Sequence, residues 1–323
     1  MPYIKEKNIK GKKYKYLSKS IRLPNGKIKS IEKIITDREK PFKELEKEST
    51  DFFIQKEKEI FSNYALSTYK TSSIFTKDQL KKIGDIKVDY SYTIKKFTKT
   101  QLKDAFNRFI ANFTYESNAI EGNSLTLKDV SIVMFEKRAI EGKDLKEIYE
   151  TRNSREVMNY ILKKKFKVRE PDIIKMHEML MKDIDITTGY KKIPNFIVGS
   201  EIELTPPEKV EKEMEELTQW HDEAIKKMHP LQVSALFHGK FEQIHPFEDG
   251  NGRVGRFLSN IILINNGYPP LIIRKSQRDS YIKCLQDFYN KGHTENLERL
   301  FLEKYKDTYR KFFEVYLKYV KKQ

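Results

Sequence analysis

Residues 245–256 carry side chains whose types and spacing suit phosphate chemistry. The stretch combines a histidine (His245), a carboxylate (Asp249), a glycine-rich turn and two arginines. Gly250 and Gly252 lack a Cβ and tolerate positive φ, so the backbone there can approach a phosphate closely. A histidine beside such an anion cradle can act as a base, because imidazole titrates near neutral pH. These residues predict a site for chemistry on a phosphate-bearing substrate.

A helix must position this site. Apolar side chains at helical spacing predict a helix over residues 251–266, directly after the glycine turn (Val254, Leu258, Ile261, Ile262). Its free N–H groups and positive dipole end would face a bound phosphate. The alternative is an ordinary Asp-Gly/Asn-Gly turn between two helices, with solvated arginines.

The segment resembles the signature of the Fic family, HxFx(D/E)GNGRxxR, and meets every specified position. Residues 230–238 upstream and 267–271 downstream also resemble family members. The resemblance implies that His245 is the general base and that Asp249 holds Mg²⁺, or alternatively Mn²⁺. It also implies a set of residues that bind the phosphates of ATP (Gly250, Asn251, Gly252, Arg253, Arg256). Phe247 is expected to anchor the loop in the core.

The resemblance further implies a protein adenylyltransferase, which moves AMP from ATP to a Ser, Thr or Tyr hydroxyl of a target protein. Doc-type relatives have a similar signature without the second glycine and transfer the γ-phosphate instead. Gly252 therefore favours adenylyl transfer. Alternatives are a Doc-type phosphotransferase and transfer of another phosphate-bearing group, such as phosphocholine. Self-modification is expected to be measurable.

A second segment, Ser117 to Asn123, resembles the family's inhibitory motif, (S/T)xxxE(G/N). A helix is predicted over residues 98–120, so Glu121 would lie at its end. In the family, this glutamate pairs with the second arginine of the signature, here Arg256, and the resemblance implies the same use of Ser117 and Glu121. One guanidinium cannot serve a carboxylate and a phosphate together, so the enzyme would be autoinhibited. Some members also remove AMP from the target, and the resemblance leaves that reaction open.

Residues 187–207 contain short β-rich runs separated by Gly, Pro and Asn, which predict a hairpin. In position it resembles the Fic flap, which aligns a target segment by strand addition. Ile193, Pro194, Asn195 and Phe196 are the expected target-positioning residues. Lys192 departs from the family pattern, which has an arginine there.

The fold is expected to be mainly α: a Fic-fold helical core with a β-hairpin flap and a small N-terminal β-hairpin and helix. The expected division is an appendage at 1–97, a catalytic domain at 98–304 and a C-terminal helix end at 305–323. A hairpin is predicted from strands 14–22 and 27–35, followed by one helix over 41–69. Further helices are predicted over 127–136, 144–163, 171–182, 207–227, 230–244, 276–290 and 295–321.

The net charge of +16 raises the alternative of a basic nucleic-acid-associated regulator with a vestigial site. Lysines are interleaved with 47 acidic residues along the chain, which argues against specific recognition. A salt-sensitive, nonspecific association with polyanions fits the composition better.

The cysteine content and the hydropathy of the chain indicate the cellular compartment of the protein. The single cysteine, Cys284, rules out an internal disulfide and suits a reducing compartment; it is expected to be buried. There is no apolar run near the ~20 residues of a membrane helix, and the first residues lack a secretory segment. A cytoplasmic protein without membrane contact is expected. The target protein and the oligomeric state, a homodimer included, stay open.

Overall fold

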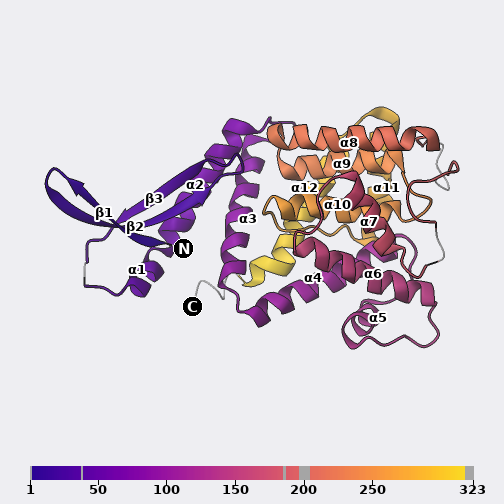
Figure 1. Cartoon of the computed structure of the whole chain (residues 1–323), viewed down its shortest axis with the longest axis horizontal. Coiled ribbons are helices and arrows are strands. Elements are labelled where there is room, and N and C mark those ends of the chain that lie inside the picture. Colours follow the sequence, from indigo (N-terminus) through magenta and orange to yellow (C-terminus); the bar gives the residue numbers. More distant parts are fainter. Residues whose placement is uncertain (1, 38, 185–186, 196–203, 317–323) are drawn as a thin grey trace.

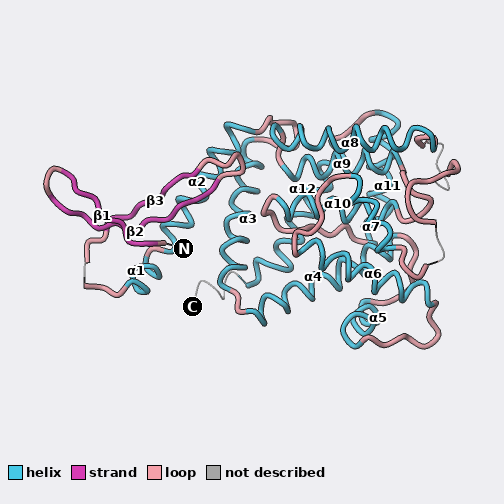
Figure 2. The backbone as a smooth tube through the Cα atoms, viewed as in Figure 1, coloured by secondary structure: helices cyan, strands magenta, loops and turns pink. Residues whose placement is uncertain are grey.

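The computed structural model describes residues 2–37, 39–184, 187–195 and 204–316 and is mainly helical (Figures 1 and 2). One small antiparallel sheet and one short helix precede a long helix at one end of the molecule, and the other helices form its body. The helices of the described part are α1 (Phe42–Glu48), α2 (Thr50–Thr68), α3 (Lys77–Lys96), α4 (Lys99–Ile120), α5 (Leu127–Ser131), α6 (Leu145–Leu162), α7 (Glu170–Leu180), α8 (Pro207–Lys227), α9 (Pro230–Ile244), α10 (Asn251–Asn265), α11 (Arg278–Lys291) and α12 (Glu295–Tyr309).

The N-terminal sheet has the order β1 (Tyr3–Ile9), β2 (Lys12–Arg22) and β3 (Ile28–Ile34). β2 pairs antiparallel with both neighbours, since Tyr3 faces Ser18 and Arg22 faces Ile28. A small cluster joins the sheet to α2 (Leu17, Ile21, Ile31, Ile35, Phe53). The predicted hairpin is confirmed as β2 and β3. β1 was missed, because its exposed lysines and isoleucines carry no buried face.

Residues 245–250, the first half of the Fic-like signature, lie between two buried helices. Almost all of α9 and α10 is buried, and a six-residue connection, 245–250, links them. One large apolar cluster surrounds them with side chains from α4, α6, α7 and α8, and a second adds side chains from α2, α3, α11 and α12. A loop held between two buried helices has few ways to move, so its side chains are presented in a fixed arrangement.

Most predicted helices are present, with α8 and α9 at the predicted bounds and Pro207 and Pro230 in their first turns. The prediction of one helix over 41–69 was wrong: the chain breaks at Ser49 into α1 and α2. α3 was missed altogether. The helices predicted at 127–136 and 295–321 continue as π-helical turns at Ile132–Glu136 and Arg310–Glu314.

The central part of the predicted flap lies outside the described residues, since 196–203, with Phe196 among them, are not described. Its described flanks, 187–195 and 204–206, are irregular. Cys284 is half-buried rather than buried. Within the described ranges, no helix combines the length and apolar character needed to cross a membrane.

Candidate active site

His245 ends helix α9 in the left-handed conformation (φ 50°, ψ 60°), which is uncommon for a residue with a Cβ. Its Nδ1 lies 3.3 Å from the carbonyl oxygen of Glu242. A carbonyl only accepts, so the proton sits on Nδ1 and Nε2 keeps a free lone pair. Burial lowers the pKa of the imidazole to about 4. The ring is therefore neutral at physiological pH and can accept a proton through Nε2.

Stacking and hydrogen bonds hold the loop after His245. Phe247 is fully buried and stacks on His177 with ring centroids 3.9 Å apart. His177 Nε2 lies 3.1 Å from the carbonyl oxygen of Asp249. The Asn251 side chain accepts from the Phe247 N–H at 2.9 Å and donates to the Phe247 carbonyl at 2.8 Å. The expectation that Phe247 anchors the loop in the core is confirmed. The Asn251 side chain thus braces the loop through both of its polar atoms.

Gly250 is the N-cap of α10 and has a φ of +80°. This φ lies in the left-handed region that favours glycine, and a Cβ there would also lie 2.4 Å from Cε at the flexible end of the Met181 side chain. Asp249 precedes it with a carboxylate that is 48% exposed, and its Oδ1 accepts from the Gly250 N–H at 2.5 Å. No group of three or more metal-binding side chains occurs in the described parts of the chain. A single accessible carboxylate fits Mg²⁺ that is held mainly by substrate phosphates.

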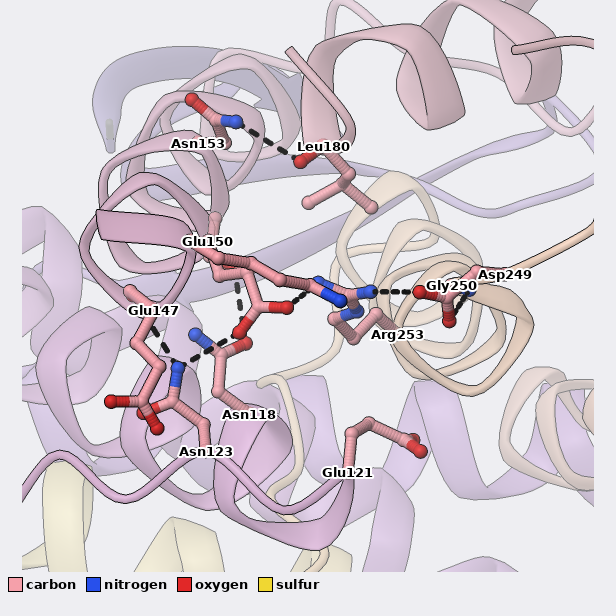
Figure 3. Close-up of polar contacts among 12 residues, drawn as sticks. Asn118, Glu121, Asn123, Glu147, Glu150, Asn153, Leu180, Asp249, Gly250 and Arg253 are labelled. Carbon is pink, nitrogen blue, oxygen red and sulfur yellow. Dashed lines mark hydrogen bonds and ion pairs between the residues drawn. The ribbon is translucent and has the colours of Figure 1, made fainter. Parts of the chain in front are cut away.

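Arg253 is 3% exposed and is held between two carboxylates (Figure 3). Its Nη1 lies 2.9 Å from Glu150 Oε1 on α6, and its Nη2 lies 3.5 Å from Asp249 Oδ2. The other Glu150 oxygen accepts from Asn123 Nδ2 at 2.8 Å. The Asn123 N–H in turn donates to the Asn118 carbonyl at the end of α4. Glu150 thus connects the turn that carries Glu121 to the first arginine of the signature.

Glu150 and Asn123 were not among the residues singled out from the sequence. The signal that could have found Glu150 is its place in α6, whose buried side also carries Thr151, Asn153 and Ser154. Polar residues at buried helix positions indicate partners elsewhere in the fold. Asn153 shows the same behaviour, because its Nδ2 donates to the Leu180 carbonyl at 3.0 Å (Figure 3).

We expect Glu150→Ala to lower the free energy of unfolding by about 3 kcal/mol, because removing one partner of a buried ion pair leaves the other charge uncompensated. Chemical denaturation followed by circular dichroism measures this. Glu156→Ala is the matched control, since Glu156 is an exposed glutamate on the same helix, and it should change stability by no more than about 0.5 kcal/mol. Equal stability of the two variants would show that Arg253 does not depend on Glu150.

Arg256 is also 3% exposed, and Ser117 and Glu121 hold it. Its Nη2 lies 2.6 Å from Glu121 Oε1, and its Nε donates to Ser117 Oγ at 2.9 Å. Glu121 lies at the end of α4, as expected from the sequence, and is the C-cap of that helix. A Cβ on Gly252 would lie 2.2 Å from Glu121 Oε1 and 3.0 Å from Arg256 Nη1. The ion pair therefore occupies the space directly over the first turn of α10.

A cavity of about 160 Å³ opens beside this ion pair, and His245, Gly252, Arg256 and Glu121 line it. The rest of its wall comes mostly from α11 and was not predicted as part of the site (Arg278, Tyr281, Ile282, Leu285, Gln286, Tyr289). Glu242 also lines it, and burial raises the pKa of that carboxyl to about 8. The cavity combines aromatic and aliphatic walls with charged groups at one end, as expected of a small-molecule site.

The described start of the flap is attached to the signature loop. The Lys191 N–H donates to the Pro246 carbonyl at 2.8 Å, and Asn195 Nδ2 donates to the Phe247 carbonyl at 2.9 Å. Ile193 is 64% exposed, and Pro194 is also exposed. The exposed pair lies between two residues bonded to the loop that carries His245.

Comparison with known proteins places the chain near one family. Residues 167–263 match the Fic/DOC family. Two curated proteins named protein adenylyltransferase Fic are similar to it. The one from Nematostella vectensis is 34% identical over 195 residues, which cover 58% of this chain and 44% of that protein. The one from Drosophila erecta is 36% identical over 177 residues, which cover 53% of this chain and 36% of that protein. The chain thus matches less than half the length of these relatives.

Among solved structures, a Fic-domain-containing signaling protein from Bacteroides thetaiotaomicron has a TM-score of 0.64 to this chain at 24% identity. The similarity covers 74% of this chain and 98% of that one. It bears on the fold and agrees with the expected Fic-fold helical core.

Proposed function

From the Fic domain that this chain contains, we propose that the protein is an adenylyltransferase, restrained by Glu121, that moves AMP from ATP to a hydroxyl of a protein target. The observation that carries the proposal is the common cavity lined by His245, Gly252 and Arg256, with Glu121 at its edge. It brings a neutral base, the N-terminus of a helix and a buried arginine together at one small-molecule site.

In the proposed reaction, the hydroxyl oxygen of the target attacks the α-phosphorus of ATP. His245 Nε2 accepts the proton of that hydroxyl as the new bond forms. The bond from the α-phosphorus to the bridging oxygen breaks, and pyrophosphate leaves. The Nδ1–H contact with the Glu242 carbonyl keeps the required tautomer throughout. That carbonyl also accepts from the imidazolium that forms, so the protonated ring stays oriented.

The phosphates are expected to lie at the first turn of α10. The backbone N–H groups after Gly250 and the guanidinium groups of Arg253 and Arg256 are the donors nearest to that position. Asp249 would hold Mg²⁺, or Mn²⁺, which supplies charge neutralisation at the phosphates when bound. The planar guanidinium of Arg253 is already held by Glu150, so it can meet a phosphate without large reorganisation.

Autoinhibition is proposed from the contact between Glu121 and Arg256. The guanidinium already donates to Glu121 and to both the hydroxyl and the carbonyl of Ser117. Nη1 of Arg256 lacks a hydrogen-bond partner among the described residues. A triphosphate that needed the Nη2 donor would have to displace the Glu121 carboxylate first. Removal of AMP from the modified target, with Glu121 orienting the water, is a secondary proposal.

The His245 imidazole should titrate with a midpoint near pH 4, because burial disfavours its charged form. NMR of the free protein, with the resonance assigned by its loss in His245→Ala, measures the midpoint directly. The base form then persists throughout the physiological range and is lost only as pH falls toward the midpoint. A midpoint near the ordinary value of ~6.5 would mean that the ring is solvated.

The experiment that tests the proposed function uses the Glu121→Gly protein and ATP labelled at the α- or the γ-phosphate. Retention of the α-label alone on protein after denaturing electrophoresis supports adenylyl transfer. Retention of the γ-label alone would replace the proposal with a Doc-type phosphotransferase. If neither label is retained, on this protein or on added protein acceptors, the proposed activity is rejected.

The remaining expectations also stay proposals. Ile193, Pro194 and Asn195 are proposed to align the target segment, because they lie in the part of the flap that is bonded to the His245 loop. The proposed partners are ATP and a protein that carries a hydroxyl acceptor, self-modification and a homodimer included. The division at 97 and 304 stays a prediction. So does a cytoplasmic location, which rests on the single cysteine.

A further inference from the structure

The N-terminal sheet together with its turns holds more than half of the net charge of the chain. Residues 2–35 contain eleven Lys or Arg and two Asp or Glu, which gives +9 of the total +16. They make up about a ninth of the length. The sequence made lysines look evenly spread, but the fold gathers these on one small sheet. Charge of this density on one element indicates a polyanionic partner.

The outer end of this sheet is a two-stranded ribbon. β3 ends at Ile34 opposite Tyr16, and the Ile35 N–H still donates to the Lys15 carbonyl, so the stretch of β2 from Lys12 to Tyr14 pairs with β1 alone. The turn is formed by Lys10 and Gly11, both with positive φ. Figure 1 shows this end of the sheet as the part of the molecule farthest from the helical body. The ribbon therefore reaches a partner without contact to the candidate active site.

Lysines lie on both faces of the ribbon, because paired residues share a face and successive residues alternate. Lys7 and Lys12 lie on one face with Tyr14, according to the pairs Lys7–Tyr14 and Ile9–Lys12. Lys13 and Lys15 lie on the other, paired with Asn8 and Glu6. A planar bilayer surface would meet one face only. A groove bordered by two phosphate strands meets both.

We propose that the β1–β2 ribbon is a binding arm for duplex DNA. The major groove of B-DNA admits a two-stranded β-ribbon, and lysines on both faces would then lie toward the phosphates on either side. The lysines at the turn and along both faces supply positive charge for contacts to phosphates. Contacts to phosphates do not depend on base sequence, so we expect the arm to bind duplex DNA with little sequence preference. This inference is independent of the proposed transfer chemistry.

The test measures fluorescence anisotropy of a short labelled DNA duplex of mixed sequence with the full chain, as a function of salt. The triple variant Lys10→Gln, Lys12→Gln, Lys15→Gln removes charge from the turn and both faces. The matched control is Lys209→Gln, Lys212→Gln, Lys226→Gln, which removes equal charge from exposed positions of α8. Circular dichroism melting checks that both variants remain folded.

The wild type and the α8 variant should bind the duplex alike. The ribbon variant should bind roughly tenfold more weakly, and the slope of log affinity against log salt should fall by about 0.9 for each lost phosphate contact. Equal weakening by the two triple variants would overturn the proposal, because charge alone and not the ribbon would then matter. Binding to phosphatidylserine vesicles without binding to the duplex would overturn it in favour of a membrane surface. Tighter binding to the single strand than to the duplex would rule out insertion into the groove.

Discussion

His245→Ala should lower transfer of α-labelled AMP by about 10²- to 10⁴-fold, the usual contribution of a positioned general base. The variant should still bind Mg·ATP, because the proposed phosphate contacts come from the α10 N-terminus and the two arginines. Nucleotide affinity is measured by calorimetry and transfer by label retained on protein, both in the Glu121→Gly background.

His293→Ala is the control for this experiment, since His293 is exposed and lies between α11 and α12. It should leave both quantities unchanged. Loss of nucleotide binding in His245→Ala would mean that the ring holds the loop or the ligand, and the role of base would have to be withdrawn. If His245→Ala transferred AMP as fast as its parent, the role of His245 as a base would likewise have to be withdrawn.

Glu121→Gly should raise both ATP affinity and transfer. A hydrogen bond to a charged partner contributes about 1.5 to 3 kcal/mol. The carboxylate is 42% exposed, so solvent screens part of this and the lower end applies, which corresponds to about a tenfold gain. Glycine also clears the space over Gly252 that the carboxylate occupies.

Glu121→Gln separates charge from shape in the same assay. It keeps the volume of the side chain but gives up the ion pair with Arg256, so its activity should lie between those of the wild type and Glu121→Gly. If all three proteins bind ATP equally and transfer at equal rates, the contact is structural and the autoinhibition claim fails.

Structure could be predicted from the sequence where one short segment contains all the residues that determine its conformation. Residues 245–256 carry their turn, their helix start and their charged groups within a few residues, so the loop could be predicted from sequence. The motif around Glu121 ends a helix whose apolar period is clear. The pairing of Glu121 with Arg256 came from resemblance and not from any local pattern, because the two residues are far apart in the chain.

The parts that were missed depend on contacts between distant segments. In the sequence, Glu150 cannot be distinguished from the other glutamates of its charged helix. Its role depends on Arg253, which α10 places beside it in the fold. The cavity wall on α11 consists of ordinary amphipathic helix residues, including Tyr281 and Leu285. Helix α3 contains a glycine and several β-branched residues, which lower its intrinsic helix propensity. Tertiary packing stabilises it instead.

The location of Glu121 and Arg256 on one polypeptide has a consequence for how the protein behaves at different abundances. A carboxylate carried on the same chain as its arginine acts at a fixed effective concentration, set by α4 and α10 and unaffected by dilution. An inhibitor on a separate polypeptide loses occupancy when either component becomes scarce. The proposed inhibition of transfer by Glu121 would therefore be the same at low and at high protein concentration. It would be relieved by a ligand that binds preferentially when Glu121 is released from Arg256.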